Sequence, residues 1–482
     1  MFKVKIGLEI HCQLTSLKTK LFCGCSSDYR NKEPNSCTCP VCLGLPGSLP
    51  VLNKKALEHV IMISLALNSK ISKEFLFYRK NYFYPDLPKN FQISQWDRAG
   101  AVLLATGGYV DITVDHRRKR IGIRNIHLEE DPARIAYTGS ISTSPYALVD
   151  YNRSGIALVE IVTEPDLSSP KEARLFLKKL RSILEHLGVS DGSLEGAMRC
   201  DANISLAGGK RVEIKNISSF KEVERALNFE ILRQRALLEK GEKVVRETRH
   251  WDEVGRVTIS LRVKETEQDY RYFPEPDIVP IIIHDEQIQL IKEKMPELPD
   301  ARRERFIKQY ELPEYDASVL TSSKALADFF EECVKLYPNS KVISNWIMSD
   351  YLRALHDLGV DVEDAKMSPS YLVEMIRLID DGTISGKIAK KLLPEMTKSG
   401  KSPTQIVREA GLTRIASGAV IEQVVNKVFN EHPSAVRDAL MDEKAINFLV
   451  GQLMKLTAGR ADPVLANKIV REKLSKMKSQ TM

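Results

Sequence analysis

Long apolar segments are missing from this sequence of 482 residues, and so are the common glycine-rich nucleotide motifs. No run approaches the ~20 apolar residues that cross a bilayer, and MFKVKIGLEI at the N-terminus has no basic segment followed by an apolar one. Neither G-x-x-x-x-G-K-[ST] nor G-x-G-x-x-G after a strand is present. We therefore expect a cytosolic protein without a membrane segment, which binds any nucleotide by other means.

Cysteine is scarce outside one segment. Of the eight cysteines, Cys12, Cys200 and Cys333 stand singly in apolar patterns typical of a core, and the other five lie between residues 23 and 42. In a cytosolic protein such a cluster favours metal over disulfides. The spacing C-x-C and then C-x-C-x-x-C is typical of a zinc knuckle, in which four thiolates close a tetrahedral structural site. The pattern leaves one of the five spare, and we favour as ligands Cys23, Cys25, Cys39 and Cys42.

The net charge of +7 is unevenly distributed along the chain. Residues from Tyr371 onward carry 18 Lys and Arg against 12 Asp and Glu, whereas the preceding residues carry 53 against 52. A basic segment attached to a nearly neutral body is expected of a protein that contacts nucleic acid, although many basic helices are only solvated faces.

Three regions differ in their periodicity. Alternating apolar and polar runs with a few helical segments predict a strand-rich α+β domain over residues 1–290, which includes the cysteine loop 23–42. Its clearest helix follows Ser168-Ser169-Pro170, with apolar residues at helical spacing up to Gly188. Helical periodicity predicts an all-α domain over 291–367 and an all-α tail over 368–482, where aromatic residues become rare.

The predicted strand from Lys3 to Leu14 alternates cleanly, so that Glu9 and His11 project together from its polar face. A second predicted strand ends in Glu129-Glu130-Asp131, and His127 shares a face with Glu129. Clustered carboxylates repel one another and are tolerated on a solvated turn or stabilised by a hard cation such as Mg²⁺. Both interpretations are open from these residues alone.

A hairpin is predicted around Gly208-Gly209. A two-residue turn would place an apolar and a charged residue on one face, so we favour a three-residue loop with a glycine in the left-handed region. This register sets Asp201 opposite Lys215 and Asn203 opposite Glu213. An ordinary cross-strand ion pair is the simplest interpretation.

Seven segments, in this order, resemble the signatures of one protein family. They are KIGLEIH (5–11), RKNYFYPDLPKNFQISQ (79–95), HLEED (127–131), DYNRSGIALVEIVTEPD (150–166), MRCDANIS (198–205), VEIKN (212–216) and KETEQDYRYFPEPD (264–277). The family comprises the B and E subunits of tRNA-dependent amidotransferases. The resemblance covers nearly the whole chain, and the absence of an extra inserted block after Asp277 makes it more similar to the B branch.

The resemblance implies a cradle-shaped catalytic domain, a helical domain and a tail that contacts tRNA. It implies ATP-dependent phosphorylation of the side-chain carboxylate on misacylated Glu-tRNA(Gln), Asp-tRNA(Asn) or both, followed by attack of ammonia on the acyl phosphate. Mg²⁺ would neutralise and orient the phosphates.

The resemblance also implies roles for residues in the matching motifs. Expected at the divalent cation are Glu9, His11, Glu129 and Glu130, with Glu213 less certain. Expected at ATP phosphates and the developing charge are Lys89, Asn152, Arg153 and Lys215, while Asp201 either contributes to this site or positions Lys215. Tyr82 and Tyr84 either line a pocket for the terminal adenosine or belong to the core.

The expected partners follow from what the sequence does not contain. It has no Gly/Ser-rich amidase segment with a nucleophilic serine and no cysteine placed as a glutaminase nucleophile. The resemblance implies that an amidase-type A subunit supplies ammonia through a tunnel and that a small C subunit clamps the pair. The alternative hypotheses are a non-catalytic zinc-containing tRNA-binding subunit and a kinase of small carboxylic acids, and the latter leaves the basic tail unexplained.

Overall fold

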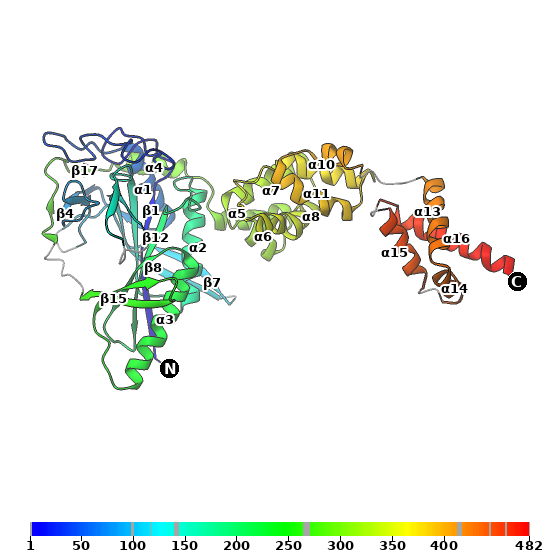
Figure 1. Ribbon diagram of the computed structural model, residues 1–482. Helices are drawn as coiled ribbons and strands as arrows, with labels where there is room; N and C mark the ends of the chain where they lie inside the picture. Colours follow the sequence, from blue (N-terminus) through cyan, green and yellow to red (C-terminus); the bar gives the residue numbers. More distant parts are fainter. Residues whose placement is uncertain are drawn as a thin grey trace. The chain divides into compact units, whose positions relative to one another are not determined.

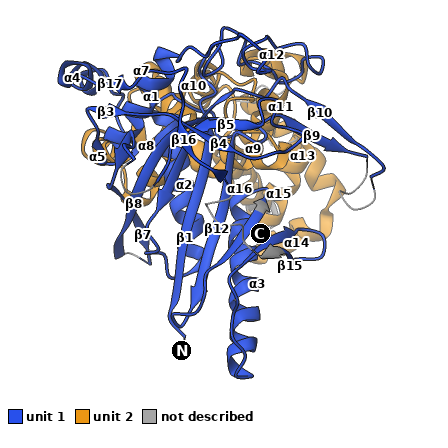
Figure 2. Cartoon of the chain, turned by 90° about the vertical axis from the view of Figure 1, so that its left-hand side faces the viewer, with its two compact units in different colours: residues 1–299 blue, residues 300–482 orange. Residues whose placement is uncertain are grey.

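The computed structural model describes residues 2–97, 101–115, 117–138, 144–263, 270–411, 417–442, 445–457 and 460–481. The motif that begins at Lys264 therefore lies outside the described residues as far as residue 269. The chain divides into two compact units, Met1–Pro299 and Asp300–Met482 (Figure 2). The first is dominated by strands and the second consists of helices, which confirms the predicted α+β class.

A ten-stranded sheet is the centre of the first unit (Figure 1). Its order is β15-β14-β13-β12-β1-β11-β8-β6-β2, and β7 pairs with β8. The strands are β1 (Val4–Gln13), β2 (Lys70–Ile71), β6 (Ala105–Thr106), β7 (Tyr109–Val114), β8 (Arg117–Glu130), β11 (Ala157–Thr163), β12 (Met198–Leu206), β13 (Val212–Ile217), β14 (Glu247–Asp252) and β15 (Val257–Val263). Strand β1 is antiparallel to both neighbours, and only β13 and β14 pair in parallel among the described strands of this sheet.

The sheet separates an apolar core from a polar face. In β1, Ile6, Leu8, Ile10 and Cys12 are at most 1% exposed and belong to one core with residues from α1 (Lys54–Ala66), α2 (Pro170–His186) and α3 (Phe220–Glu239). Helix α2 begins as its sequence predicts, because the Ser169 hydroxyl accepts from the N–H of Glu172 and proline occupies the first turn. Since side chains alternate along a strand, burying this face turns Glu9 and His11 to the other one.

Smaller sheets and the cysteine loop complete the first unit. The three-stranded sheet β16-β4-β5 contains β4 (Tyr78–Asn81), β5 (Phe91–Ser94) and β16 (Phe273–Pro274). The pairs are β3 (Glu74–Phe75) with β17 (Ile281–Ile282), and β9 (Arg134–Tyr137) with β10 (Ala147–Asp150). Helix α4 spans Asp285–Glu293, and the cysteine loop lies between β1 and α1.

The predicted hairpin register between β12 and β13 is confirmed. Asn203 lies opposite Glu213 and Ile204 opposite Val212, and Gly208 has a φ of +74° in the connection. A bulge between Cys200 and Ala202 interrupts the ladder, and Lys215 still forms an ion pair with Asp201.

Two apolar cores organise the helical unit. The first contains buried residues from Phe306 to Val407 and the second from Ile421 to Leu474. The first core crosses Ser368, since Leu372 and Met375 of α10 are fully buried in it. The helices are α5 (Pro299–Tyr310), α6 (Glu314–Leu320), α7 (Lys324–Leu336), α8 (Ser340–Trp346), the π-helical turn η2 (Ile347–Tyr351), α9 (Leu352–Leu358), α10 (Pro369–Asp380), α11 (Gly386–Ser399), α12 (Pro403–Glu409), α13 (Gly418–Glu431), α14 (Pro433–Met441), α15 (Ile446–Leu456) and α16 (Pro463–Thr481). None of the helices in the described ranges is long and apolar enough to cross a membrane.

Candidate functional site

Strand pairing gathers acidic and basic side chains on the polar face of the large sheet. On β1, Glu9 lies opposite Asp201 of β12, and His11 lies opposite Glu160 of β11. Directly opposed residues of antiparallel strands project from the same face. Four strands therefore contribute to one group, because His127 of β8 lies opposite Glu160.

Glu9, His11 and Glu160 form a candidate metal centre. One ligand atom from each of these three residues lies within 4.8 Å of the others. Two carboxylates and one imidazole suit a divalent cation that prefers oxygen and nitrogen ligands. The sequence prediction named Glu9 and His11 but not Glu160. The signal was present, since Glu160 is a charged residue between buried Val159 and Ile161 in one of the family motifs.

Other side chains hold the carboxylates of this group in place. His127 Nδ1 lies 3.4 Å from Glu160 Oε2, and His11 Nε2 lies 3.6 Å from Glu129 Oε1. The Ser94 hydroxyl donates a 2.7 Å hydrogen bond to Glu129. Glu129 is thus adjacent to the three candidate ligands and is oriented by a second contact.

The pKa values of these carboxyls are driven apart. Burial and the neighbouring Glu160 raise the pKa of both Glu9 and Glu129. Burial acts to raise the pKa of Glu160 as well, but His127, His11 and Lys80 outweigh it and lower that pKa to about 2. The group holds excess negative charge, which a bound cation would offset.

A second set of charges lies further along the same face. Lys215 forms ion pairs with Asp201 and with Glu213 (3.4 Å), and Thr248 donates a 3.0 Å hydrogen bond to Glu213. Burial acts to lower the pKa of Lys215, but Asp201, Glu213 and Glu9 raise it, so the ammonium stays charged. The structure therefore brings a cation close to the candidate metal ligands.

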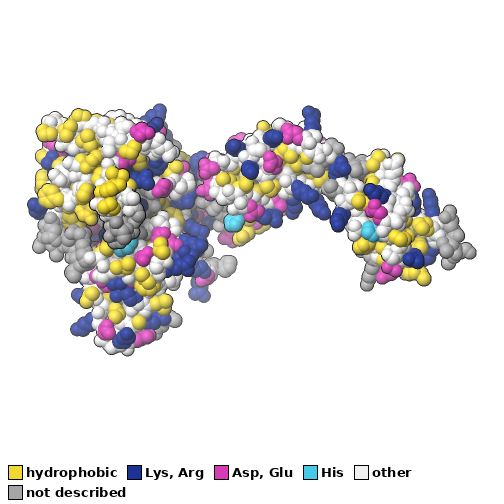
Figure 3. Space-filling model, in the orientation of Figure 1, with side chains coloured by type: hydrophobic (Ala, Val, Ile, Leu, Met, Phe, Trp, Pro, Cys, Tyr) yellow, Lys and Arg dark blue, Asp and Glu magenta, His cyan; other side chains and the backbone are white. Residues whose placement is uncertain are grey.

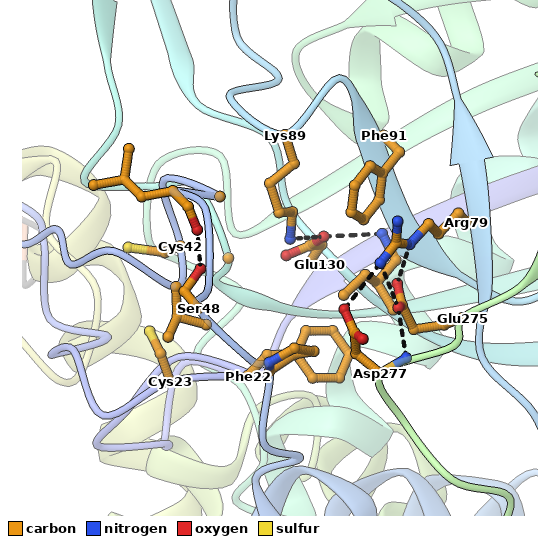
Figure 4. Close-up of a pocket in the computed structure, with 16 residues that line it drawn as sticks. Phe22, Cys23, Cys42, Ser48, Arg79, Lys89, Phe91, Glu130, Glu275 and Asp277 are labelled. Carbon is orange, nitrogen blue, oxygen red and sulfur yellow. Dashed lines mark hydrogen bonds and ion pairs between the residues drawn. The ribbon is translucent and has the colours of Figure 1, made fainter.

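Glu130 projects away from this group. It pairs with Lys89, accepts a 2.9 Å hydrogen bond from the N–H of Ile93, and lines a pocket of about 210 Å³. Figure 4 shows Lys89 and Arg79 reaching toward carboxylates in this pocket, with Cys23 and Cys42 on its other side. Adjacent residues of a strand face opposite ways, so Glu129 and Glu130 serve different sites.

Asn152 and Arg153 are engaged in holding loops. The Asn152 side chain is fully buried, accepts from the N–H of Cys37 (2.6 Å) and donates to the carbonyl of Glu33 (2.8 Å). Arg153 donates to the carbonyls of Pro132 and Ala133. The structure does not bring these two side chains to the Glu9–His11–Glu160 group.

Aromatic rings and a lysine lie near the carboxylates on the polar face. The ammonium of Lys80 lies 5.8 Å from the ring centre of Tyr82 and 5.1 Å from that of Tyr270. Burial acts to lower the pKa of Lys80, but Tyr272, Tyr82 and Glu129 raise it. Tyr84, by contrast, is 59% exposed.

Four of the five clustered cysteines converge. The thiols of Cys23, Cys25, Cys39 and Cys42 lie within 4.8 Å of one another, and this group does not include Cys37. A hydrogen bond from Cys23, the N–H of Cys39 and the Lys20 ammonium lower the pKa of the Cys42 thiol to about 4, against the effect of burial. The donor set fits a closed tetrathiolate metal site.

The raised pKa of Glu9 gives a prediction about stability. The folded chain holds the Glu9 proton more tightly than the unfolded chain, so the contribution of this carboxyl to stability is lost as pH rises through its folded pKa. At neutral pH, Glu9→Gln should therefore stabilise the metal-free chain, by on the order of 1 kcal/mol. Thermal unfolding with and without Mg²⁺ measures this, and the added stability from Mg²⁺ should disappear in the variant.

Glu230→Gln is the matched control. Glu230 is also fully buried but forms a 2.6 Å ion pair with Arg233, so its replacement should lower stability by about 3–5 kcal/mol. A Glu9→Gln chain that melts as early as Glu230→Gln would contradict the prediction.

Comparison with known proteins places the chain in a family. Residues 4–289 match the model of the GatB/GatE catalytic domain, and residues 328–474 match that of the GatB domain. Curated proteins described as the B subunit of an aspartyl/glutamyl-tRNA(Asn/Gln) amidotransferase are similar over the full length. The protein from Saccharolobus solfataricus is 53% identical over 472 residues, covering 98% of this chain and 99% of the relative. The protein from Thermotoga maritima is 50% identical over 482 residues, covering 98% and 99%. The chain belongs to the GatB/GatE family.

Proposed function

We propose that the chain is the B subunit of a glutamine-dependent amidotransferase that acts on misacylated Glu-tRNA(Gln), Asp-tRNA(Asn) or both. Its relatives carry this name, and the Glu9–His11–Glu160 group beside Lys215 is the observation that supports the chemistry. The γ-phosphoryl group of ATP passes to an oxygen of the side-chain carboxylate, and ADP leaves. Ammonia then forms the carbon–nitrogen bond as phosphate departs, giving the amide.

Each residue on the polar face has a defined task in this proposal. Glu9, His11 and Glu160 hold Mg²⁺, and Glu129 supports His11 from the side. When bound, Mg²⁺ neutralises phosphate charge and polarises the transferred group. Lys215 supplies a fixed positive charge near the developing negative charge, while Glu213 and Asp201 position its ammonium.

Ammonia reaches this chain from a partner. We propose an amidase-type A subunit as the glutaminase and a small C subunit that clamps the two, which agrees with the description of the relatives as one subunit of several. Lys89 and Glu130 lie apart from the candidate metal centre, so their tasks differ from that of the metal ligands.

Substitution of the metal group tests the chemistry. Glu9→Gln, His11→Ala and Glu160→Gln should each abolish tRNA-dependent ATP hydrolysis, because each removes a proposed ligand. The glutaminase activity of the assembled partner should persist. Glu164→Gln, an exposed carboxylate just beyond β11, is the control and should behave as wild type. Normal amide formation with ordinary Mg²⁺ dependence in all three variants would refute the assignment.

The same assay separates the alternative functions. A non-catalytic tRNA-binding subunit would show no ATP turnover with misacylated tRNA, and a kinase of small carboxylic acids would turn over ATP without it. ATP hydrolysis that requires misacylated tRNA supports the amidotransferase alone.

For the four-cysteine group we propose one structural zinc ion. Cys39→Ser or Cys42→Ser should lose the metal and lower stability, because the binding free energy of a structural ion is part of the folding free energy. Elemental analysis and thermal unfolding measure both effects. Cys37→Ser should keep a full equivalent, since Cys37 stands outside the group. Full metal content in the Cys39/Cys42 double variant would exclude this site.

We also propose that the basic tail contacts the tRNA. Helix α16 concentrates its positive charge, with Lys468, Arg471, Lys473, Lys476 and Lys478 against the single acid Glu472. Figure 3 shows the mixture of basic and acidic side chains on one face of the molecule. With few aromatic residues, this part fits phosphate and shape recognition better than base stacking.

Neutralising the tail tests this contact. Replacing Lys468, Arg471, Lys476 and Lys478, all exposed, by Gln should weaken tRNA binding and flatten its salt dependence by roughly 0.7–0.9 in log–log slope per lost phosphate contact. The Michaelis constant for tRNA should rise far more than the turnover number falls. Lys335→Gln on α7 is a control for an exposed lysine elsewhere.

A truncation gives an independent test of the tail. A cut after Gly411 spares the first helical core, whereas a cut at Ser368 would pass through it. Well-folded complexes of the four-site variant and of residues 1–411 that bind tRNA as tightly as the full chain would refute the contact.

A further inference from the structure

Gly44 connects the four-cysteine loop to the ion pair in the neighbouring pocket. It follows Cys42 by two residues and has a φ of +67°, a conformation that suits glycine. A Cβ atom at this position would lie 2.3 Å from Lys89 Cγ, 3.1 Å from Lys89 Cβ and 3.2 Å from Lys89 Cα. Backbone and side chain of Lys89 therefore pack directly against the loop, and nothing larger than glycine fits between them.

The contact bears on a side chain that is held in one place. Lys89 pairs with Glu130, and the two side chains are only 10% and 5% exposed. Glu130 is fixed independently, because it also accepts from the N–H of Ile93. A buried ion pair of this kind needs good geometry to offset the loss of hydration, so a displaced Lys89 would leave the pair.

Gly155 provides a second connection between the loop and Glu130. Its φ is +84°, and a Cβ there would lie 3.4 Å from Cys42 Cβ and 3.9 Å from Glu130 Oε2. Its carbonyl accepts from the N–H of Leu21, and the neighbouring Ser154 hydroxyl donates to the carbonyl of Cys42 (3.3 Å). Cys42 and Glu130 thus lie on either side of one glycine (Figure 4).

The turn that carries Gly44 is small. Its backbone hydrogen bonds are short-range, from Leu43 to Cys39, from Gly44 to Val41 and from Leu45 to Pro40. Because the four thiols come from both ends of the loop, a metal bound by them would fix the turn relative to the rest of the unit.

We propose that the four-cysteine loop is a positioning device for Lys89: the bound metal fixes the turn, and Gly44 fixes the lysine against Glu130. Loss of the metal, or a side chain at residue 44, releases Lys89 from the ion pair into solvent. The metal site then has a task beyond stability, since it controls whether a cation lines the pocket. This inference uses the thiolate metal of the proposed function but does not depend on the transamidation reaction.

Lysine reactivity in the full, zinc-loaded chain tests the proposal. A brief treatment with an acetylating reagent, read out by peptide mass spectrometry, should modify Lys89 slowly and the exposed Lys55 and Lys73 rapidly. In Gly44→Ala, Lys89 labelling should rise roughly tenfold. The zinc content should stay at one equivalent, and the buried Lys20 beside Cys42 should stay protected.

Gly47→Ala is the matched control, because Gly47 lies in the same loop at a φ of +84° and a Cβ atom added there would have no atom within 4 Å. It imposes the same kind of backbone strain without the contact and should leave Lys89 protected. Chelation of zinc from the wild-type chain decides the question if Gly44→Ala fails to fold, and it should expose both Lys89 and Lys20. The proposal is overturned if Lys89 stays slow in folded Gly44→Ala or after chelation, or if Gly47→Ala accelerates it equally. None of these outcomes depends on ATP or tRNA, so they are distinct from a failure of the proposed function.

Discussion

The pairing of β1 between β11 and β12 is the constraint on which the site depends. Each strand alternates, so burial of Ile6, Leu8 and Ile10 in the core determines which side chains face the other way. A shift of one residue in either ladder would turn Glu9 and His11 into the apolar core and separate them from Glu160. The free energy that orders the core thus also assembles the candidate metal centre.

Charge on the polar face shows a second constraint, which acts against stability. Glu9, Glu129 and Glu160 crowd together, and burial and mutual repulsion raise the pKa of two of them. The structure contains cations that offset part of this charge, among them Lys80 and Lys215. A protein that needed only a stable sheet would have no reason to keep this arrangement, which is typical of sites that bind a cation.

Sequence patterns predicted the parts of the site that follow from local periodicity. Alternation identified Glu9 and His11, cysteine spacing identified the four thiols that converge, and face matching identified the register of Asn203 with Glu213. Glu160 was missed, because its partnership with His11 depends on a ladder between strands about 150 residues apart. The grouping of Glu130 with Glu129 ignored the same alternation that identified Glu9. The hydrogen bonds of Asn152 to the cysteine loop are a tertiary feature that no local pattern encodes.

The long separation between β1 and its partners also has a kinetic consequence. Residues 157–163 and 198–206 complete both ladders of β1, so roughly 150 to 190 residues must be synthesised after the first strand before it is paired. At the usual pace of translation this takes about 10–40 s, during which an apolar strand has two open edges. The nascent chain is therefore exposed to mispairing and chaperone binding for much longer than a hairpin would be. It also carries Glu9 and His11 throughout that interval without Glu160, so metal capture at this face can only follow synthesis of the third strand.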